Sequence, residues 1–154
     1  MVSAEQVRAI VAEVRDPEIP VLSIADLGIL RDVEVAADRV VITITPTYSG
    51  CPAMDMIRSD IGERLHESGI EEAEIRTVLA PAWSTDWMTD EARRKLAEYG
   101  IAPPGPAAEE PLSVGCPRCG SGNVKELSRF GATACQAQYA CQSCLEPFDH
   151  FKAH

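Results

Sequence analysis

Two pairs of cysteines near the end of the chain restrict its fold more than any other feature. Cys116 and Cys119 form one C-x-x-C pair, and Cys141 and Cys144 form a second pair, with twenty-one residues between the pairs. Two residues between ligands allow both sulfurs of a pair to reach one tetrahedral metal ion. The module over 115–154 has few large apolar side chains, and metal ligation compensates for such a small core. The spacing predicts a zinc ribbon with a structural zinc ion. An iron–sulfur cluster is the alternative, because four thiolates suit both.

Three further potential ligands are left out of the predicted metal shell. Cys135 precedes Cys141 by six residues, and we interpret it as a small strand residue packed under the metal site, since four ligands already close the shell. His150 and His154 could replace a thiolate. Histidines near the end of a chain are more often solvated, so neither is included.

A proline-rich stretch separates this module from the preceding residues. Residues 101–114 contain four prolines, a glycine and two adjacent glutamates, a composition typical of a stiff linker rather than of a packed element. We therefore expect an N-terminal domain over 1–100, a linker over 101–114 and the metal-binding module over 115–154.

Hydrophobic periodicity predicts an α+β N-terminal domain, with a small mixed sheet and helices. Ser3 and Gln6 form a capping-box pattern at the start of the first helix, and Thr89 is suited to cap the last one. The apolar stretch 21–30 is broken by Gly28 and is expected to be a turn that leads into the first strand. The expected elements, in chain order, are a helix over 3–15, strands over 29–35 and 39–45 that form a hairpin, a helix that starts at Pro52 and stops at Gly69, a strand over 74–80 and a helix over 90–99.

Cys51 has a suggestive position within this domain. It lies between an apolar strand and a helix, directly before Pro52, a residue suited to the first helical position. Cys51 is therefore the predicted N-cap, where unpaired amides and the helix dipole favour the thiolate. Helix geometry alone leaves two interpretations open, a reactive or metal-holding thiol and a buried structural cysteine.

The charge of the chain limits its partners. The net charge is −10, and an acidic surface argues against a nucleic-acid partner while it favours solubility. No apolar run is long enough to cross a bilayer, and the first residues lack the pattern of a secretory signal. We therefore expect a cytoplasmic protein without a membrane partner, with cysteines that are reduced or metal-bound.

Several motifs together resemble known families. The motifs of the N-terminal domain are Asp16-Pro17-Glu18, Asp26-Leu27-Gly28, Thr45-Pro46-Thr47 and Gly50-Cys51-Pro52. They resemble the domain of iron–sulfur cluster assembly proteins related to SufT. In combination with the tail over 130–152, the chain resembles the PaaD (PaaJ) family of phenylacetate-degradation proteins. Members of that family are encoded with the multicomponent phenylacetyl-CoA epoxidase, which uses a di-iron oxygenase and a reductase that carries an iron–sulfur cluster.

The resemblance implies an accessory maturation role in phenylacetate catabolism. The chain would assist the insertion of an iron–sulfur cluster or of iron into the epoxidase system, without turnover chemistry of its own. Cys51 would be a transient ligand of the metal or cluster, and Asp16 and Glu18 would form its supporting loop. A plainer interpretation of these two acidic residues is helix termination with solvated charges. Epoxidase components or the reductase would be the protein clients; the client and a homodimeric state are left open.

Other functional classes are less well supported. A direct, non-catalytic subunit of the epoxidase complex is the main alternative. A catalytic oxygenase is disfavoured, because no pair of Glu-x-x-His motifs is present and the three histidines are scattered. A thiol oxidoreductase is disfavoured because its C-x-x-C pair usually follows a strand, whereas here two pairs bracket a small module. Trp83 and Trp87 could form a partner-contact surface or pack on the sheet.

Overall fold

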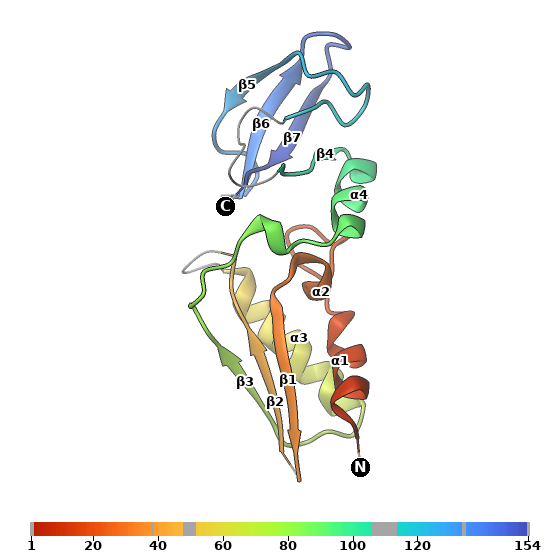
Figure 1. Cartoon of the computed structure of the whole chain (residues 1–154), viewed down its shortest axis with the longest axis vertical. Coiled ribbons are helices and arrows are strands. Elements are labelled where there is room, and N and C mark those ends of the chain that lie inside the picture. Colours follow the sequence, from red (N-terminus) through yellow and green to blue (C-terminus); the bar gives the residue numbers. More distant parts are fainter. Residues whose placement is uncertain (1, 38, 48–51, 106–113, 134, 154) are drawn as a thin grey trace. The chain divides into compact units, whose positions relative to one another are not determined.

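Two compact units make up the chain, Met1–Trp83 and Ser84–His154. They are seen in a computed structural model that describes residues 2–37, 39–47, 52–105, 114–133 and 135–153. Each unit has its own sheet (Figure 1).

The first unit contains a small mixed sheet with helices, which confirms the predicted α+β class. The strand order is β1-β2-β3, with β1 antiparallel to β2 and β2 parallel to β3. Because α3 connects the two parallel strands, β2, α3 and β3 form a crossover unit. The elements are α1 (Ala4–Ala12), α2 (Ile24–Leu27), β1 (Leu30–Ala36), β2 (Arg39–Ile44), α3 (Ala53–Glu67) and β3 (Ala73–Thr77).

The start of α1 confirms the predicted capping box. The amide of Gln6 donates to Oγ of Ser3 at 3.2 Å, and Oε1 of Gln6 accepts the amide of Ser3 at 2.8 Å. These bonds satisfy amides that have no partner within the helix. Val7 and Val11 of α1 are fully buried, so the apolar stripe faces the core as the periodicity predicted.

The short helix α2 occupies part of the stretch that was expected to be a turn, so that prediction was wrong there. Ser23 and Asp26 form a second capping box, with bonds of 3.1 and 3.0 Å between each side chain and the other residue's amide. Gly28 ends the helix at a φ of 76°, a conformation that glycine adopts without steric cost. The pattern Ser-x-x-Asp followed by Gly is the sequence signal for this helix.

One face of the sheet is buried by α1 and α3, which also pack against each other. Val40, Ile42 and Ile44 alternate along β2 and are all buried, as a strand with one covered face requires. The residues that α3 buries include the four expected from its spacing, Met54, Ile57, Ile61 and Leu65.

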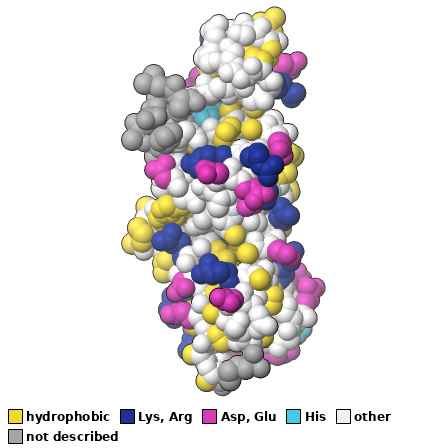
Figure 2. Space-filling model, turned by 45° about the vertical axis from the view of Figure 1, so that its right-hand side comes forward, with side chains coloured by type: hydrophobic (Ala, Val, Ile, Leu, Met, Phe, Trp, Pro, Cys, Tyr) yellow, Lys and Arg dark blue, Asp and Glu magenta, His cyan; other side chains and the backbone are white. Residues whose placement is uncertain are grey.

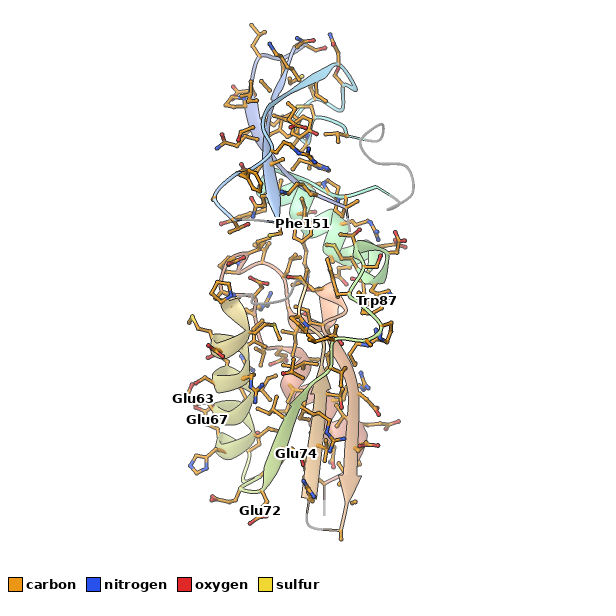
Figure 3. The ribbon with its side chains drawn as sticks, turned by 90° about the vertical axis from the view of Figure 1, so that its left-hand side faces the viewer. Glu63, Glu67, Glu72, Glu74, Trp87 and Phe151 are labelled. Atoms are coloured by element: carbon orange, nitrogen blue, oxygen red, sulfur yellow. The ribbon has the colours of Figure 1, made fainter. Side chains whose placement is uncertain are left out.

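The surface of the first unit is strongly charged. Glu63 and Glu67 project outward from α3, while Glu74 lies on β3 (Figure 3). Glu74 pairs with Arg39 and Arg76, and such exposed pairs contribute little stability, about 0–1 kcal/mol each. On the face drawn in Figure 2, acidic and basic side chains are interspersed, which favours solubility.

The second unit is a four-stranded sheet with the order β4-β7-β6-β5. β5, β6 and β7 run antiparallel to their neighbours, and β4 pairs with β7 in parallel. Besides a short 3₁₀ turn over Thr85–Trp87, its elements are α4 (Asp90–Tyr99), β4 (Ile101–Ala102), β5 (Val124–Ser128), β6 (Gln136–Cys141) and β7 (Pro147–Phe151).

The helix α4 has the predicted bounds and the predicted cap. Oγ1 of Thr89 accepts the amide of Ala92 at 3.0 Å. The guanidinium of Arg93 donates to three backbone carbonyls, those of Thr85, Met88 and Pro104. Arg93 therefore holds the chain before and after α4 against the helix.

The ends of the expected linker are buried, and the first of them forms strand β4. Ile101 and Ala102 are buried in β4, and Val114 is buried in the same core as Tyr139 and Phe148. The middle of the linker, 106–113, lies outside the described residues. The compact units divide between Trp83 and Ser84, because α4 packs on β4. The boundary at residue 100 stays a prediction about independent folding.

Candidate metal centre

The four cysteines of the ribbon lie on two turns of the same construction. In the first turn, the amide of Gly120 donates to the carbonyl of Cys116 at 2.9 Å, and the amide of Cys116 donates to the carbonyl of Ser121 at 2.9 Å. The second turn links β6 to β7, and there the amide of Cys141 donates to the carbonyl of Glu146 at 2.9 Å. Each turn therefore presents two sulfurs on one side.

The two turns bring all four sulfurs together. The Sγ atoms of Cys116, Cys119, Cys141 and Cys144 all lie within 4.8 Å of one another. Across the turns, Sγ of Cys116 is 3.7 Å from Sγ of Cys144, and Sγ of Cys119 is 3.5 Å from Sγ of Cys141. The set predicted from the C-x-x-C spacing is therefore assembled at one point.

These distances fit a single ion better than a cluster. An ion held at about 2.3 Å from four tetrahedral sulfurs separates those sulfurs by about 3.8 Å. A cluster would place several iron and sulfide atoms between the thiolates and spread them further apart. The sulfur set is thus suited to one tetrahedral metal ion.

Hydrogen bonds favour the thiolate form at Cys141. The amides of Cys144 and Ser143 both donate to its Sγ at 3.4 Å and lower its pKa to about 6, with the Cys144 amide the larger cause. The Glu146 amide lowers the pKa of Cys144, but burial and the neighbouring sulfurs raise it to about 12. A metal ion requires all four thiolates, so its binding releases the protons that remain on such thiols.

The residue after each pair has a left-handed backbone. Gly120 has a φ of 77°, and Leu145 has a φ of 66°. The Leu145 side chain is also 81% exposed. A non-glycine residue in this region is uncommon, and the sequence offered no sign that Leu145 occupies a glycine-like position.

Cys135 and His150 lie outside the sulfur cluster, in agreement with their exclusion. Cys135 is buried, and its Sγ is 3.0 Å from Oγ1 of Thr133. The expectation of a solvated His150 was wrong: it is 1% exposed, and its Nδ1 donates to the carbonyl of Ala102 at 3.0 Å. Its burial follows from the pairing of β7 with β4. His154 lies outside the described residues.

The acidic loop of the first unit is closed by hydrogen bonds. Oδ1 of Asp16 accepts the amides of Glu18 and Ile19 at 2.7 and 3.1 Å, and the Asp16 amide donates to the carbonyl of Leu22 at 2.9 Å. Burial raises the pKa of the Asp16 carboxyl above 3.8, although the two amides oppose this. Burial also raises the pKa of Glu18, to which the charge of Asp16 adds. Asp16 is thus a buried loop-closing group rather than a solvated charge.

Cys51 lies outside the described residues, and its predicted position as the N-cap of α3 was wrong. The residue at the N-cap of α3 is Pro52, with helical φ and ψ of −66° and −23°. The helix therefore begins one residue later than expected, at Ala53.

Thr45, at the end of β2, was not singled out from the sequence as a site residue. It is 1% exposed, and its Oγ1 has no hydrogen-bond partner among the described residues. Nothing in its sequence position signals that state.

Two further expectations concern the surface. Trp83 is 5% exposed and its Nε1 donates to the carbonyl of Leu27 at 2.8 Å, so it packs inside the first unit rather than forming a contact surface. Within the described part of the chain, no helix has the length and apolar character needed to cross a membrane.

Comparisons with known proteins match the two units separately. Residues 4–79 match a family described as iron–sulfur cluster assembly protein, and residues 102–152 match the PaaD zinc beta ribbon domain. The chain is 47% identical over 150 residues to a protein of Escherichia coli (strain K12) that is named as a subunit of 1,2-phenylacetyl-CoA epoxidase. The match covers 96% of this chain and 91% of that protein.

Other proteins resemble part of the chain. The chain is 36% identical over 94 residues to an Fe-S protein maturation auxiliary factor of Porphyromonas gingivalis, a match that covers 60% of this chain and 89% of that protein. A crystal structure of a domain of unknown function (DUF59) from Bacillus anthracis has 33% identity and a TM-score of 0.56, covering 60% of this chain and 90% of that one.

Proposed function

The chain belongs to the PaaD family, and from this premise we propose that it is an accessory maturation factor. It assists the insertion of an iron–sulfur cluster, or of iron, into the multicomponent phenylacetyl-CoA epoxidase system, whose oxygenase or reductase components are its clients. The observation that carries the proposal is the union of an assembly-type unit and a zinc-ribbon unit in one chain. The maturation factor that matches 60% of the chain supports the same role.

The cysteines have separate tasks in this proposal. The four ribbon sulfurs are mutually close enough to hold one ion, which we take to be structural zinc because four protein ligands leave no open position. Cys135 is buried in the same unit. Cys51 is the one cysteine in residues 1–83, and it serves as the transient ligand of the cargo.

Transfer at Cys51 is a ligand exchange. Cargo binding releases the thiol proton and forms one metal–sulfur bond. A client thiolate then replaces Cys51 on the metal, with no change in oxidation state. Asp16 supports this site as part of its loop, together with Glu18; a buried carboxyl with a raised pKa is typical of functional sites.

The test compares cells that carry the wild-type protein, Cys51→Ser or no copy of the gene. We expect Cys51→Ser to fold normally but to leave the purified epoxidase components as poor in iron and acid-labile sulfide as those from cells without the protein. Met56→Ser is a matched control, because it also replaces a sulfur side chain with serine and lies exposed near the start of α3. Fully loaded components from Cys51→Ser cells would exclude the proposed role.

A second candidate is a non-catalytic subunit of the epoxidase complex, favoured by the name of the E. coli relative. The two roles differ in timing. A subunit changes the turnover of an epoxidase that is already fully loaded with metal, whereas a maturation factor acts only before loading. Adding the purified chain to loaded epoxidase and measuring turnover separates them; we expect no change.

A further inference from the structure

Thr45 follows the last residue of β2 and carries a hydroxyl group that is buried and, in the described part of the chain, unpaired. The residue is 1% exposed, and its Oγ1 has no partner among the described residues. Its backbone amide, in contrast, donates to the carbonyl of Ile29 at 3.0 Å. A buried hydroxyl without a partner destabilises the folded state, and valine would fill the same space without that cost. The hydroxyl of Thr45 therefore needs an explanation other than stability.

The position of Thr45 is where ligands bind in parallel α/β units. β2 and β3 are parallel, and α3 connects them, so the chain passes from the carboxyl end of β2 into the N-terminus of α3. The amide of Val78 donates to the carbonyl of Ile44 at 2.9 Å, which holds the two strand ends together. Ligands of such units bind at the carboxyl ends of the parallel strands, next to the start of the helix.

The start of α3 is suited to an anion rather than to a cation. Its N-cap residue is Pro52, whose side chain has no acceptor for the amides of the first turn. Those amides carry the positive end of the helix dipole. Ala53 and Met54 are buried, whereas Pro52 and the acidic Asp55 of the first turn are exposed, so the inner side of this helix end packs against the protein, where water screens the dipole less.

We propose that the Thr45 hydroxyl donates a hydrogen bond to a sulfur atom of the cargo, and that the cargo is an anionic, sulfide-bearing cluster rather than a bare ferrous ion. This inference rests on the proposed function. A bare cation would meet the positive end of the helix dipole. The sulfurs of a thiolate-held cluster accept hydrogen bonds, which tune its properties. The fold supplies no partner for the hydroxyl among the described residues because that partner arrives with the cargo.

The test uses the full-length, zinc-loaded protein under anaerobic conditions. Wild type, Thr45→Val, Thr45→Ser and Cys51→Ser are each titrated with ferrous iron plus sulfide, and separately with ferrous iron alone. Bound cluster is measured by visible absorption and by acid-labile sulfide after desalting. The melting temperature of the cargo-free protein is measured in parallel.

We expect Thr45→Val to melt a few degrees higher than wild type, because the substitution removes the buried, unpaired hydroxyl group. The same variant should bind the cluster about tenfold more weakly, because a hydrogen bond to a charged group is lost. Thr45→Ser keeps the hydroxyl and should bind within about twofold of wild type. Ferrous iron alone should bind poorly to every variant. A role limited to packing cannot produce higher stability together with weaker binding.

Other outcomes overturn the inference in distinguishable ways. Loss of cluster binding in Cys51→Ser with unchanged binding in Thr45→Val removes the role of Thr45 and leaves the proposed function standing. A lower melting temperature for Thr45→Val shows that a buried water satisfies the hydroxyl and also removes that role. Ferrous iron that binds as tightly as the cluster overturns the choice of cargo. Unchanged cluster binding in Cys51→Ser removes the proposed function itself.

Discussion

At the scale of single residues, Asp16 combines two opposing effects on one carboxyl group. Two backbone amides bond its Oδ1 and favour the charged form, whereas burial disfavours it and raises the pKa above 3.8. The unfolded chain therefore ionises at lower pH than the folded protein does. The contribution of Asp16 to stability is highest below 3.8 and is lost as the pH rises from there through the raised pKa of the folded state.

Asp16→Asn should stabilise the first unit at neutral pH. The amide oxygen of asparagine can still accept the bonds from Glu18 and Ile19, but the buried charge is removed. We expect a higher free energy of unfolding at pH 7 and a smaller loss of stability between acidic and neutral pH, measured by urea unfolding at a series of pH values. Asp32→Asn is the control, because Asp32 also bonds a local amide, that of Val33 at 2.8 Å, and is exposed. A less stable Asp16→Asn protein at pH 7 would contradict the assigned cost of the charge.

At the scale of elements, the two cysteine turns carry different residues at one equivalent position, the residue directly after each cysteine pair. Gly120 and Leu145 both have positive φ, 77° and 66°, yet only glycine adopts that conformation without a steric cost. A Cβ at Gly120 would have no neighbour within 4 Å, so a substitution there acts through backbone strain alone.

The two turns predict opposite effects for reciprocal substitutions. Gly120→Ala should lower the free energy of unfolding of the zinc-loaded protein by about 1 kcal/mol, the cost of a left-handed residue. Leu145→Gly should raise it by up to about 1 kcal/mol, since relief of that strain exceeds the entropy that glycine adds to the unfolded chain. Denaturant unfolding at saturating zinc measures both, and an equal zinc content in each variant is the control. A destabilised Leu145→Gly protein would show that the leucine side chain contributes more than its exposure indicates.

At the scale of the whole molecule, the two units have separate means of stabilisation. The first has a core of packed helices and strands. The second has a small core beside the sulfur cluster. The chain contains two tryptophans, Trp83 in the first unit and Trp87 in the second.

Removal of the metal should unfold the second unit alone. A chelator of zinc, added to Trp87→Phe protein, should leave the emission of Trp83 unchanged, whereas the emission of Trp87 in Trp83→Phe protein should shift to that of a solvated indole. Because Trp87 precedes α4, this shift would place α4 in the metal-dependent unit and move the domain boundary from residue 100 to residue 83. An unchanged Trp87 signal with complete zinc loss would contradict a structural role for the metal.

Local patterns account for the features that the sequence by itself determined. The capping box of Ser3, the cap of Thr89, the alternation along β2 and the paired cysteines depend on residues no more than four positions apart. Such neighbours interact whatever the rest of the chain does, so their spacing predicts the helices, the strands and two cysteine pairs that can each ligate a metal ion. The helix α2 was missed although its signal, Ser23-x-x-Asp26 before Gly28, was of the same local kind.

Only the tertiary structure decided which groups are buried and which distant residues meet. β4 pairs with β7 across almost fifty residues, which buries His150 against the carbonyl of Ala102. Asp16 is buried, although a solvated charge was one interpretation of its sequence position. Thr45 is also buried, so bulk solvent does not satisfy its hydroxyl group. Burial depends on every segment packed around a residue, and no short window of sequence contains those segments. The physical cost of a buried polar group, and the function inferred from it, therefore become visible only in the folded chain.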